Sequence, residues 1–145
     1  MHKRNEFISA ARELIDTPFV HQGRLPKSET CKGGLDCAGL GIVAARKAGI
    51  NLQDMDGYDR KPDGKSLIAH LNKILEPIDI KEAIPGDILI MCFMINPQHV
   101  AILSEKNGRS TVIHASLQDK KVVEHNISDN WKKRIIRAYR IPGIE

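Results

Sequence analysis

One cysteine and two histidines are the residues whose types and spacing could carry out covalent chemistry. Cys37 follows Asp36, and aspartate caps helix N-termini because its carboxylate accepts backbone N–H groups of the first turn. Residues 37–48 read as a helix, so Cys37 would lie in the first turn, where the helix dipole favours the nucleophilic thiolate. The interior glycines Gly39 and Gly41 predict a close approach of this helix to a sheet. The alternative is that Cys37 is a small buried apolar residue.

A β-hairpin is predicted around Asn107-Gly108, because this dipeptide favours the tight turns that join antiparallel strands. The flanking strands are expected over residues 99–104 and 110–116. If the dipeptide forms the whole loop, Lys106 faces Arg109, and this pairing sets the register of both strands.

That register places His99 and His114 on one face of the sheet. Ala101 then faces His114 and His99 faces Ser116, so the histidines are diagonal neighbours with backbones about 7–8 Å apart. Together with Cys37 they supply a nucleophile, a base and a group that orients the base. The chemistry would be acyl transfer, in which the thiolate attacks an amide carbonyl, His99 protonates the leaving amine, and water then hydrolyses the thioester. The Cys37 backbone N–H is a candidate oxyanion donor.

Other roles for the cysteines and histidines are weaker. A metal site built from the same three side chains has no motif behind it, so no metal and no cofactor is expected. Cys92 lies in an apolar run and is expected in the core. Cys31 is either incidental, a redox partner of Cys37, or part of substrate binding. The residue pattern alone assigns no chemistry to the remaining histidines, which are His2, His21, His70 and His125.

Composition limits the classes of function. The 145 residues are expected to form one domain, 1–145, and a hydrophobic content of 41% suffices for a core without disulfides. The net charge of +4 slightly favours an anionic partner such as nucleic acid or bacterial cell wall, but it is also ordinary for a soluble protein. Aromatic residues make up only 4%, too few to predict a nucleic-acid stacking surface. The N-terminal segment lacks the apolar core of a signal peptide, and no apolar run approaches the ~20 residues of a membrane span. Synthesis in the cytoplasm and no membrane span are therefore expected.

Helical periodicity comes first along the chain and strand patterns follow, which is an α+β arrangement. A polar loop over residues 18–35 leads to Cys37 and is expected to form one wall of a cleft. Trp131 is expected to cap the core. The remaining predicted elements are helices over 3–15 and 64–75 and strands over 88–95, 121–124 and 135–141.

Several motifs together resemble the NlpC family of papain-like cell-wall cysteine peptidases. They are Leu35-Asp36-Cys37-Ala38-Gly39-Leu40, Pro85-Gly86-Asp87, Gln98-His99-Val100-Ala101-Ile102 and Val112-Ile113-His114-Ala115. The resemblance implies a circularly permuted papain-like fold, with N-terminal helices packed on a C-terminal antiparallel β-sheet. It also implies that Cys37 is the nucleophile, His99 the base and His114 the orienting residue. The implied substrates are amide bonds in peptidoglycan stem peptides.

The same resemblance implies which residues bind substrate. Asp36 and Ala38 flank the nucleophile, and Phe19, His21 and Tyr58 would line the cleft. The sequence departs from the family pattern at Ala38, at Phe19 and near His21, where the aromatic residue that usually follows the tyrosine is replaced. The family often has serine at the position of Ala38, and many members have tyrosine at the position of Phe19, so this chain lacks a hydroxyl that often contacts substrate.

Two stretches are most similar to the phage and gene-transfer-agent branch of the family. They are Thr17-Pro18-Phe19 to Gly23 and Tyr58-Asp59-Arg60-Lys61-Pro62. This similarity implies delivery by a phage tail or by lysis, with phage tail proteins as partners and the virion as a possible location. The alternatives are a non-enzymatic tail-tip or assembly component that retains the fold, and an acyltransferase or other amidase with the same machinery.

Overall fold

The computed structural model describes residues 3–54, 65–92 and 99–145 of the chain. Tyr58, Gly64 and the end of the strand predicted over 88–95 lie outside the described residues. The elements, in chain order, are α1 (Lys3–Glu13), β1 (Arg24–Leu25), β2 (Gly34–Leu35), α2 (Cys37–Lys47), α3 (Lys65–Ile74), β3 (Glu76–Ile78), the 3-10 turn η1 (Ile80–Glu82), β4 (Ile88–Met91), β5 (His99–Lys106), β6 (Arg109–Ser116), β7 (Lys121–Asn126), α4 (Asp129–Lys132) and β8 (Ile135–Arg140).

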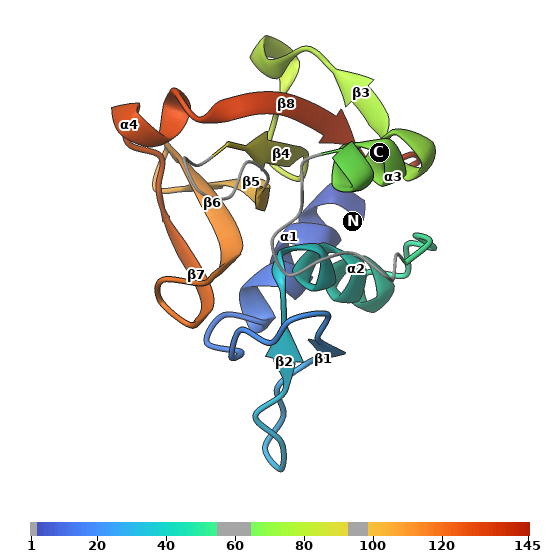
Figure 1. Cartoon of the computed structure of the whole chain (residues 1–145), viewed down its shortest axis with the longest axis vertical. Coiled ribbons are helices and arrows are strands. Elements are labelled where there is room, and N and C mark those ends of the chain that lie inside the picture. The colour runs from blue at the N-terminus through green and yellow to red at the C-terminus, as the bar shows by residue number, and fades with distance from the viewer. Residues whose placement is uncertain (1–2, 55–64, 93–98) are drawn as a thin grey trace.

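An antiparallel sheet occupies the upper and left parts of the described structure in the view of Figure 1. Its strand order is β3-β8-β4-β5-β6-β7, and every neighbouring pair is antiparallel. The hairpin register is the predicted one, since Lys106 pairs with Arg109. Asn107 and Gly108 have φ of 55° and 77°, the left-handed values that a two-residue loop of this type requires. The α+β prediction, with helices before the sheet, is confirmed.

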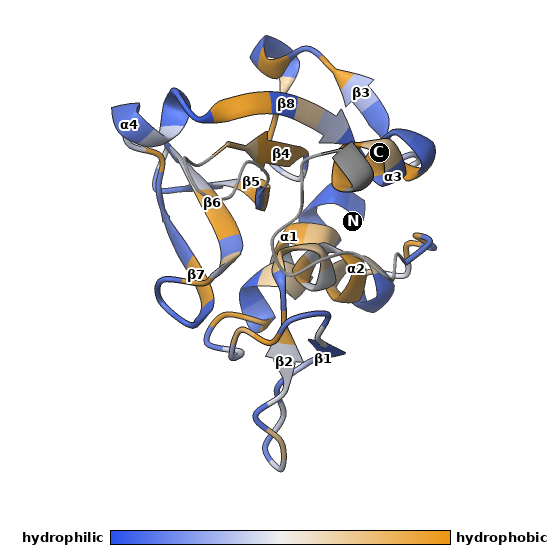
Figure 2. Ribbon diagram, in the orientation of Figure 1, coloured by the Kyte–Doolittle hydropathy of each residue, from blue (hydrophilic) through white to orange (hydrophobic). Residues whose placement is uncertain are grey.

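Helices α1 and α2 pack against each other and cover one face of the sheet. A second, smaller apolar cluster lies on the other face, around Leu89, Met91 and Leu103. Strand β4 is buried along its length, and Figure 2 shows that it is hydrophobic throughout, whereas α4 is hydrophilic. The face covered by the helices includes Phe7, Ala11, Leu14, Leu40, Val43, Ala44, Ile90, Ile102 and Ile113.

Asp87 ties the first helix to the last strand. Its side chain is fully buried and accepts hydrogen bonds from Arg4 at 2.9 Å and from Arg140 at 2.9 and 3.0 Å. The Ile84 backbone N–H donates to it as well, at 2.9 Å. Burial alone would raise the Asp87 pKa, but these donors outweigh it and hold the pKa below its usual value. The carboxylate is therefore charged and stabilised in the folded state.

The structure differs from the predicted elements at several boundaries. The segment predicted as a loop over 18–35 contains the short antiparallel pair β1 and β2, and Figure 1 shows the connection between them projecting from the body. The strand predicted over 121–124 continues to Asn126. The short strand β3, the turn η1 and the helix α4 were not predicted. Strand β3 contains Pro77, a residue that sequence patterns exclude from central strands but that an edge strand tolerates.

Candidate active site

Asp36 holds the start of α2 in place. Its backbone is extended and its carboxylate accepts the Gly39 N–H at 2.7 Å, which confirms the predicted helix cap. The same carboxylate accepts the Gln22 N–H at 2.8 Å and an Arg24 guanidinium N–H at 3.0 Å. Because Asp36 is only 2% exposed, one buried group joins the helix to the preceding loop. A contact between Asp36 and substrate stays a prediction.

Gly39 marks a close approach, but to a different neighbour from the one predicted. A Cβ atom on Gly39 would lie 2.1 Å from the Gly23 carbonyl oxygen and 2.9 Å from the Arg24 guanidinium. The helix therefore needs glycine here to pack against the 18–35 segment, and not against the sheet. Gly41 has no described atom within 4 Å of such a Cβ, so close packing does not explain it.

Cys37 is the first residue of α2 and is partly exposed. Burial raises the pKa of its thiol to about 11, and the charge of Asp36 adds to this effect. The backbone N–H groups of Val100 and Ala38 act on the sulfur in the opposite direction. The helix dipole is expected to favour the thiolate, but burial acts more strongly on the pKa and favours the thiol in the resting structure. The Val100 contact places the sulfur at the start of β5, one residue from His99.

His99 and His114 lie in direct contact, as the hairpin register predicted. His99 Nε2 and His114 Nδ1 are 2.8 Å apart, and the rings meet edge to face with centroids 4.9 Å apart. Burial lowers the pKa of His99 to about 4 and that of His114 to about 3, and both neighbouring histidines lower the latter further. Both imidazoles are therefore neutral near pH 7.

A third histidine, His125, extends this pair into a row across β5, β6 and β7. His125 Nε2 lies 2.9 Å from His114 Nε2, and its Nδ1 lies 2.9 Å from the Asn126 carbonyl oxygen. The sequence reading missed it because the predicted strand ended at residue 124. Strand β7 pairs Ser116 with Lys121 and Val112 with His125. That register puts His125 on the face of His114, and the four-residue loop over 117–120 is the sequence signal for it.

Trp131 packs against two of the three histidines, His114 and His125. Its ring centroid lies 4.9 Å from that of His114 and 4.5 Å from that of His125. Ser128 caps α4 by accepting the Trp131 N–H at 3.3 Å. The predicted core-capping role is confirmed in part, since Trp131 also packs against the smaller apolar cluster.

The other predicted site residues lie around the start of α2. The Phe19 backbone N–H donates to the Lys120 carbonyl at 2.9 Å, and its side chain packs partly against the core. His21 is half-buried and Ala38 is buried. Their contacts with substrate stay predictions, as does that of Tyr58. Cys31 is exposed in the segment between β1 and β2.

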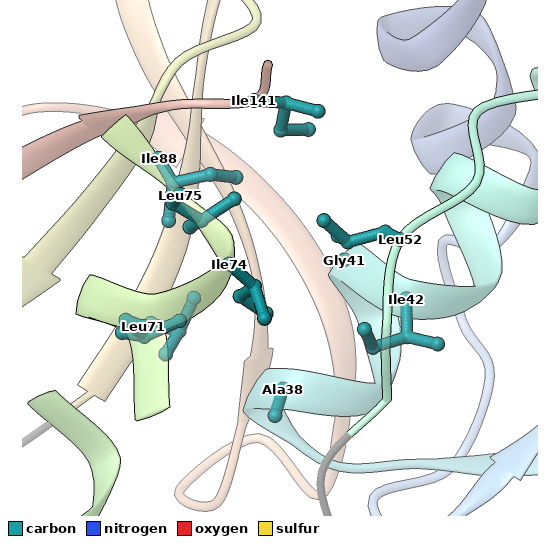
Figure 3. A pocket seen from close by; sticks show the side chains of 10 residues that line it. Ala38, Gly41, Ile42, Leu52, Leu71, Ile74, Leu75, Ile88 and Ile141 are labelled. Carbon is teal, nitrogen blue, oxygen red and sulfur yellow. The ribbon is translucent and has the colours of Figure 1, made fainter. Parts of the chain in front are cut away.

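An apolar pocket lies behind Ala38, between α2, α3 and the residue after β8 (Figure 3). It encloses about 30 Å³, and no histidine lines it. A polar peptide needs hydrogen-bonding partners, and this apolar lining does not supply them. The lining residues are Ala38, Gly41, Ile42, Leu52, Leu71, Ile74, Leu75, Ile88, Val100 and Ile141.

Within the described ranges, no three His, Cys, Asp or Glu side chains gather in a way that could hold a metal ion. No helix in the same part of the chain is long and apolar enough to cross a membrane.

Comparisons with known proteins agree with this architecture. The model of the NlpC/P60 family matches residues 16–140. The P60 domain of an antigen from M. avium subspecies paratuberculosis has 18% identity and a TM-score of 0.64, with 99% of this chain and 96% of that chain covered. For NlpC2 from Trichomonas vaginalis the identity is 17% and the TM-score 0.67, covering 97% of this chain but only 46% of that one.

A third similar structure is an N-acetylmuramoyl-L-alanine amidase from Bacteroides uniformis. Its identity is 16% and its TM-score 0.58, with 96% of this chain and 98% of that chain covered. Among curated proteins, none matches this sequence. The structural likenesses confirm the papain-like α+β fold.

Proposed function

Because this chain belongs to the NlpC/P60 family, we propose that it is a cysteine hydrolase that cleaves amide bonds in peptidoglycan stem peptides. The placement of Cys37 carries the proposal. Its sulfur faces the Val100 N–H, one residue from His99, whose ring contacts His114 at 2.8 Å. This places the candidate nucleophile beside the start of β5, the strand that carries the candidate base, and the candidate orienting group contacts that base from β6. The structural likeness to an N-acetylmuramoyl-L-alanine amidase supports amide chemistry on this class of substrate.

The resting pair in this mechanism is a thiol and a neutral imidazole, since the pKa of Cys37 is raised and that of His99 is lowered. His99 therefore accepts the thiol proton as the sulfur attacks the carbonyl carbon and the C–S bond forms. The Cys37 backbone N–H, in the first turn of α2, stabilises the oxyanion. His99 then passes the proton to the amine as the C–N bond breaks, which leaves a thioester.

Hydrolysis of the thioester completes the cycle. His99 accepts a proton from water while the water oxygen bonds to the carbonyl carbon. The C–S bond breaks, the proton returns to sulfur, and the carboxylic acid product leaves. His114 keeps the His99 ring in one orientation throughout, through the contact of 2.8 Å between His99 Nε2 and His114 Nδ1.

The test is digestion of purified peptidoglycan, with the released muropeptides identified by mass spectrometry. The wild-type protein is expected to release new fragments, and the Cys37→Ala and His99→Ala variants are expected to release none. Cys31→Ala is the matched control, because Cys31 is exposed in the segment between β1 and β2; it should cleave as the wild type does. No release by the wild type from several wall types would overturn hydrolysis and favour a non-enzymatic role.

We also propose that the protein acts in the phage and gene-transfer-agent branch, delivered with phage tail proteins. The support is the sequence similarity of the Thr17 to Gly23 stretch, which lies in the segment that leads to α2. Mass spectrometry of particles purified from cultures of the source cells should detect the chain. Its absence from such particles, with the chain present in the cell extract, would overturn this part.

A further inference from the structure

The three histidines form a continuous hydrogen-bonded chain that ends on a backbone carbonyl. We propose that His125 is a positioning residue. Its hydrogen bond to the Asn126 carbonyl fixes its own tautomer, and its contact with His114 then fixes the tautomers of His114 and His99. The catalytic consequence rests on the proposed function, whereas the tautomers themselves do not. The contacts are 2.9 Å from Asn126 O to His125, 2.9 Å from His125 to His114, and 2.8 Å from His114 to His99.

The proton positions follow from the carbonyl, because a carbonyl oxygen only accepts hydrogen bonds. His125 Nδ1 must therefore carry the proton that is donated to Asn126 O. In a neutral ring the other nitrogen, Nε2, is then an acceptor. His114 Nε2 is the atom that faces it, so His114 donates from Nε2.

The tautomer of His114 in turn fixes that of His99. With its proton on Nε2, neutral His114 presents Nδ1 as an acceptor, and the atom facing this Nδ1 is His99 Nε2. His99 therefore carries its proton on Nε2 and has its lone pair on Nδ1. When all three rings are neutral, the chain is consistent from end to end, and it leaves His99 with the acceptor nitrogen that a general base needs.

Packing keeps the rings in these orientations. His114 is only 4% exposed, so a reversed tautomer would leave an unsatisfied nitrogen in the interior. Trp131 covers both His114 and His125, and successive histidine rings meet nearly at right angles, at 89° and 85°. Ring rotation would break two contacts at once.

The experiment compares His125→Gln with His125→Met, two unbranched side chains of similar length. Glutamine keeps an oxygen that accepts from His114 Nε2, whereas methionine does not. Two-bond 1H–15N correlation spectra of the full chain near neutral pH report the tautomer of each neutral histidine. Turnover on purified peptidoglycan, with kcat and KM measured separately, reports the catalytic consequence.

The wild type should show His99 and His114 protonated on Nε2 and His125 on Nδ1. His125→Gln should keep the first two tautomers and a kcat within about threefold of wild type. His125→Met should shift His114 toward the Nδ1 form and lower kcat about tenfold at unchanged KM, the factor that corresponds to one net hydrogen bond. Equal effects of both variants on tautomer and kcat would reduce His125 to a packing residue and overturn the proposal.

The spectra separate this proposal from the proposed function. If the wild type cleaves no peptidoglycan but shows the expected tautomers, which only His125→Met disturbs, the relay stands and the hydrolase assignment fails. If the wild type cleaves and His114 carries its proton on Nδ1, the relay fails and the hydrolase assignment stands.

Discussion

The strongest prediction concerns Asp36, whose carboxylate joins the start of α2 to the loop that precedes it. Its Oδ1 accepts from Gly39 N–H and from Arg24, and its Oδ2 accepts from Gln22 N–H. Asp36→Ala removes all three hydrogen bonds. Asp36→Asn, with its oxygen at the Oδ1 position, keeps the first two and loses only the bond to Gln22.

The magnitudes follow from that count. Loss of a helix cap is worth about 1 kcal/mol, and loss of the two other bonds adds about 2 kcal/mol because both donors are partly buried. Arg24 keeps a partner in Asp54 at 3.0 Å, so the larger penalty of an isolated buried charge does not apply. We expect a loss of about 3 kcal/mol for Asp36→Ala and about 1 kcal/mol for Asp36→Asn.

The assay is equilibrium unfolding by urea together with thermal melting. In a domain of this size 1 kcal/mol shifts the melting temperature by about 3 °C, so the expected decreases are about 9 °C for Asp36→Ala and about 3 °C for Asp36→Asn. The control is Asp79→Ala, because Asp79 also caps a helical turn, by accepting the Lys81 N–H at 2.9 Å, but is exposed. Its loss should stay below about 1 kcal/mol.

The order of the Asp36 variants decides whether the reasoning holds. Asp36→Ala and Asp36→Asn melting within about 1 °C of each other would show that the acceptor at Oδ1 contributes nothing. If Asp36→Ala lowered the melting temperature by no more than Asp79→Ala does, burial of the Asp36 carboxylate would add nothing to the stability that an exposed helix cap provides.

Three further predictions concern residues of α2 and Asp87, the buried aspartate immediately before β4. Gly41→Ala should raise stability by about 1 kcal/mol through helix propensity. Gly39→Ala should lower stability by about 1–3 kcal/mol because its Cβ meets the Gly23 oxygen. If both variants shifted the melting temperature in the same direction, this reasoning would be contradicted. The folded-state pKa of Asp87 is depressed, so its stabilisation is present above the unfolded pKa of about 3.9 and is lost as pH falls through the folded value. Asp87→Asn should be less stable at pH 7 by about 3 kcal/mol, with a flatter acid limb in urea titrations; an unchanged acid limb would refute this. Alkylation of Cys37 should accelerate about tenfold per pH unit between pH 6 and 9, since its pKa is about 11; a plateau across pH 5 to 8 would instead indicate a preformed thiolate.

Features that depend on neighbours in the chain were predictable from the sequence. Asp36 caps the helix that begins at Cys37 because both the cap and its donor lie within one turn. The contact between His99 and His114 followed from a two-residue turn and the alternation of side chains along strands. Both features depend on residues that are close in the sequence, so they can be predicted without knowledge of the tertiary structure.

Tertiary structure decided what the surroundings of those residues are. Burial raised the pKa of Cys37 against the expectation from the helix dipole, and desolvation depends on every segment packed around the sulfur. Gly39 met the Gly23 carbonyl and not the sheet, because the path of the 18–35 segment has no periodic signal. His125 joined the row only because β7 runs on to Asn126 beside β6. Residue types and local spacing determined which groups could react. The solvation of Cys37 and the position of His125 beside His114 depend on contacts between segments that are distant in the sequence.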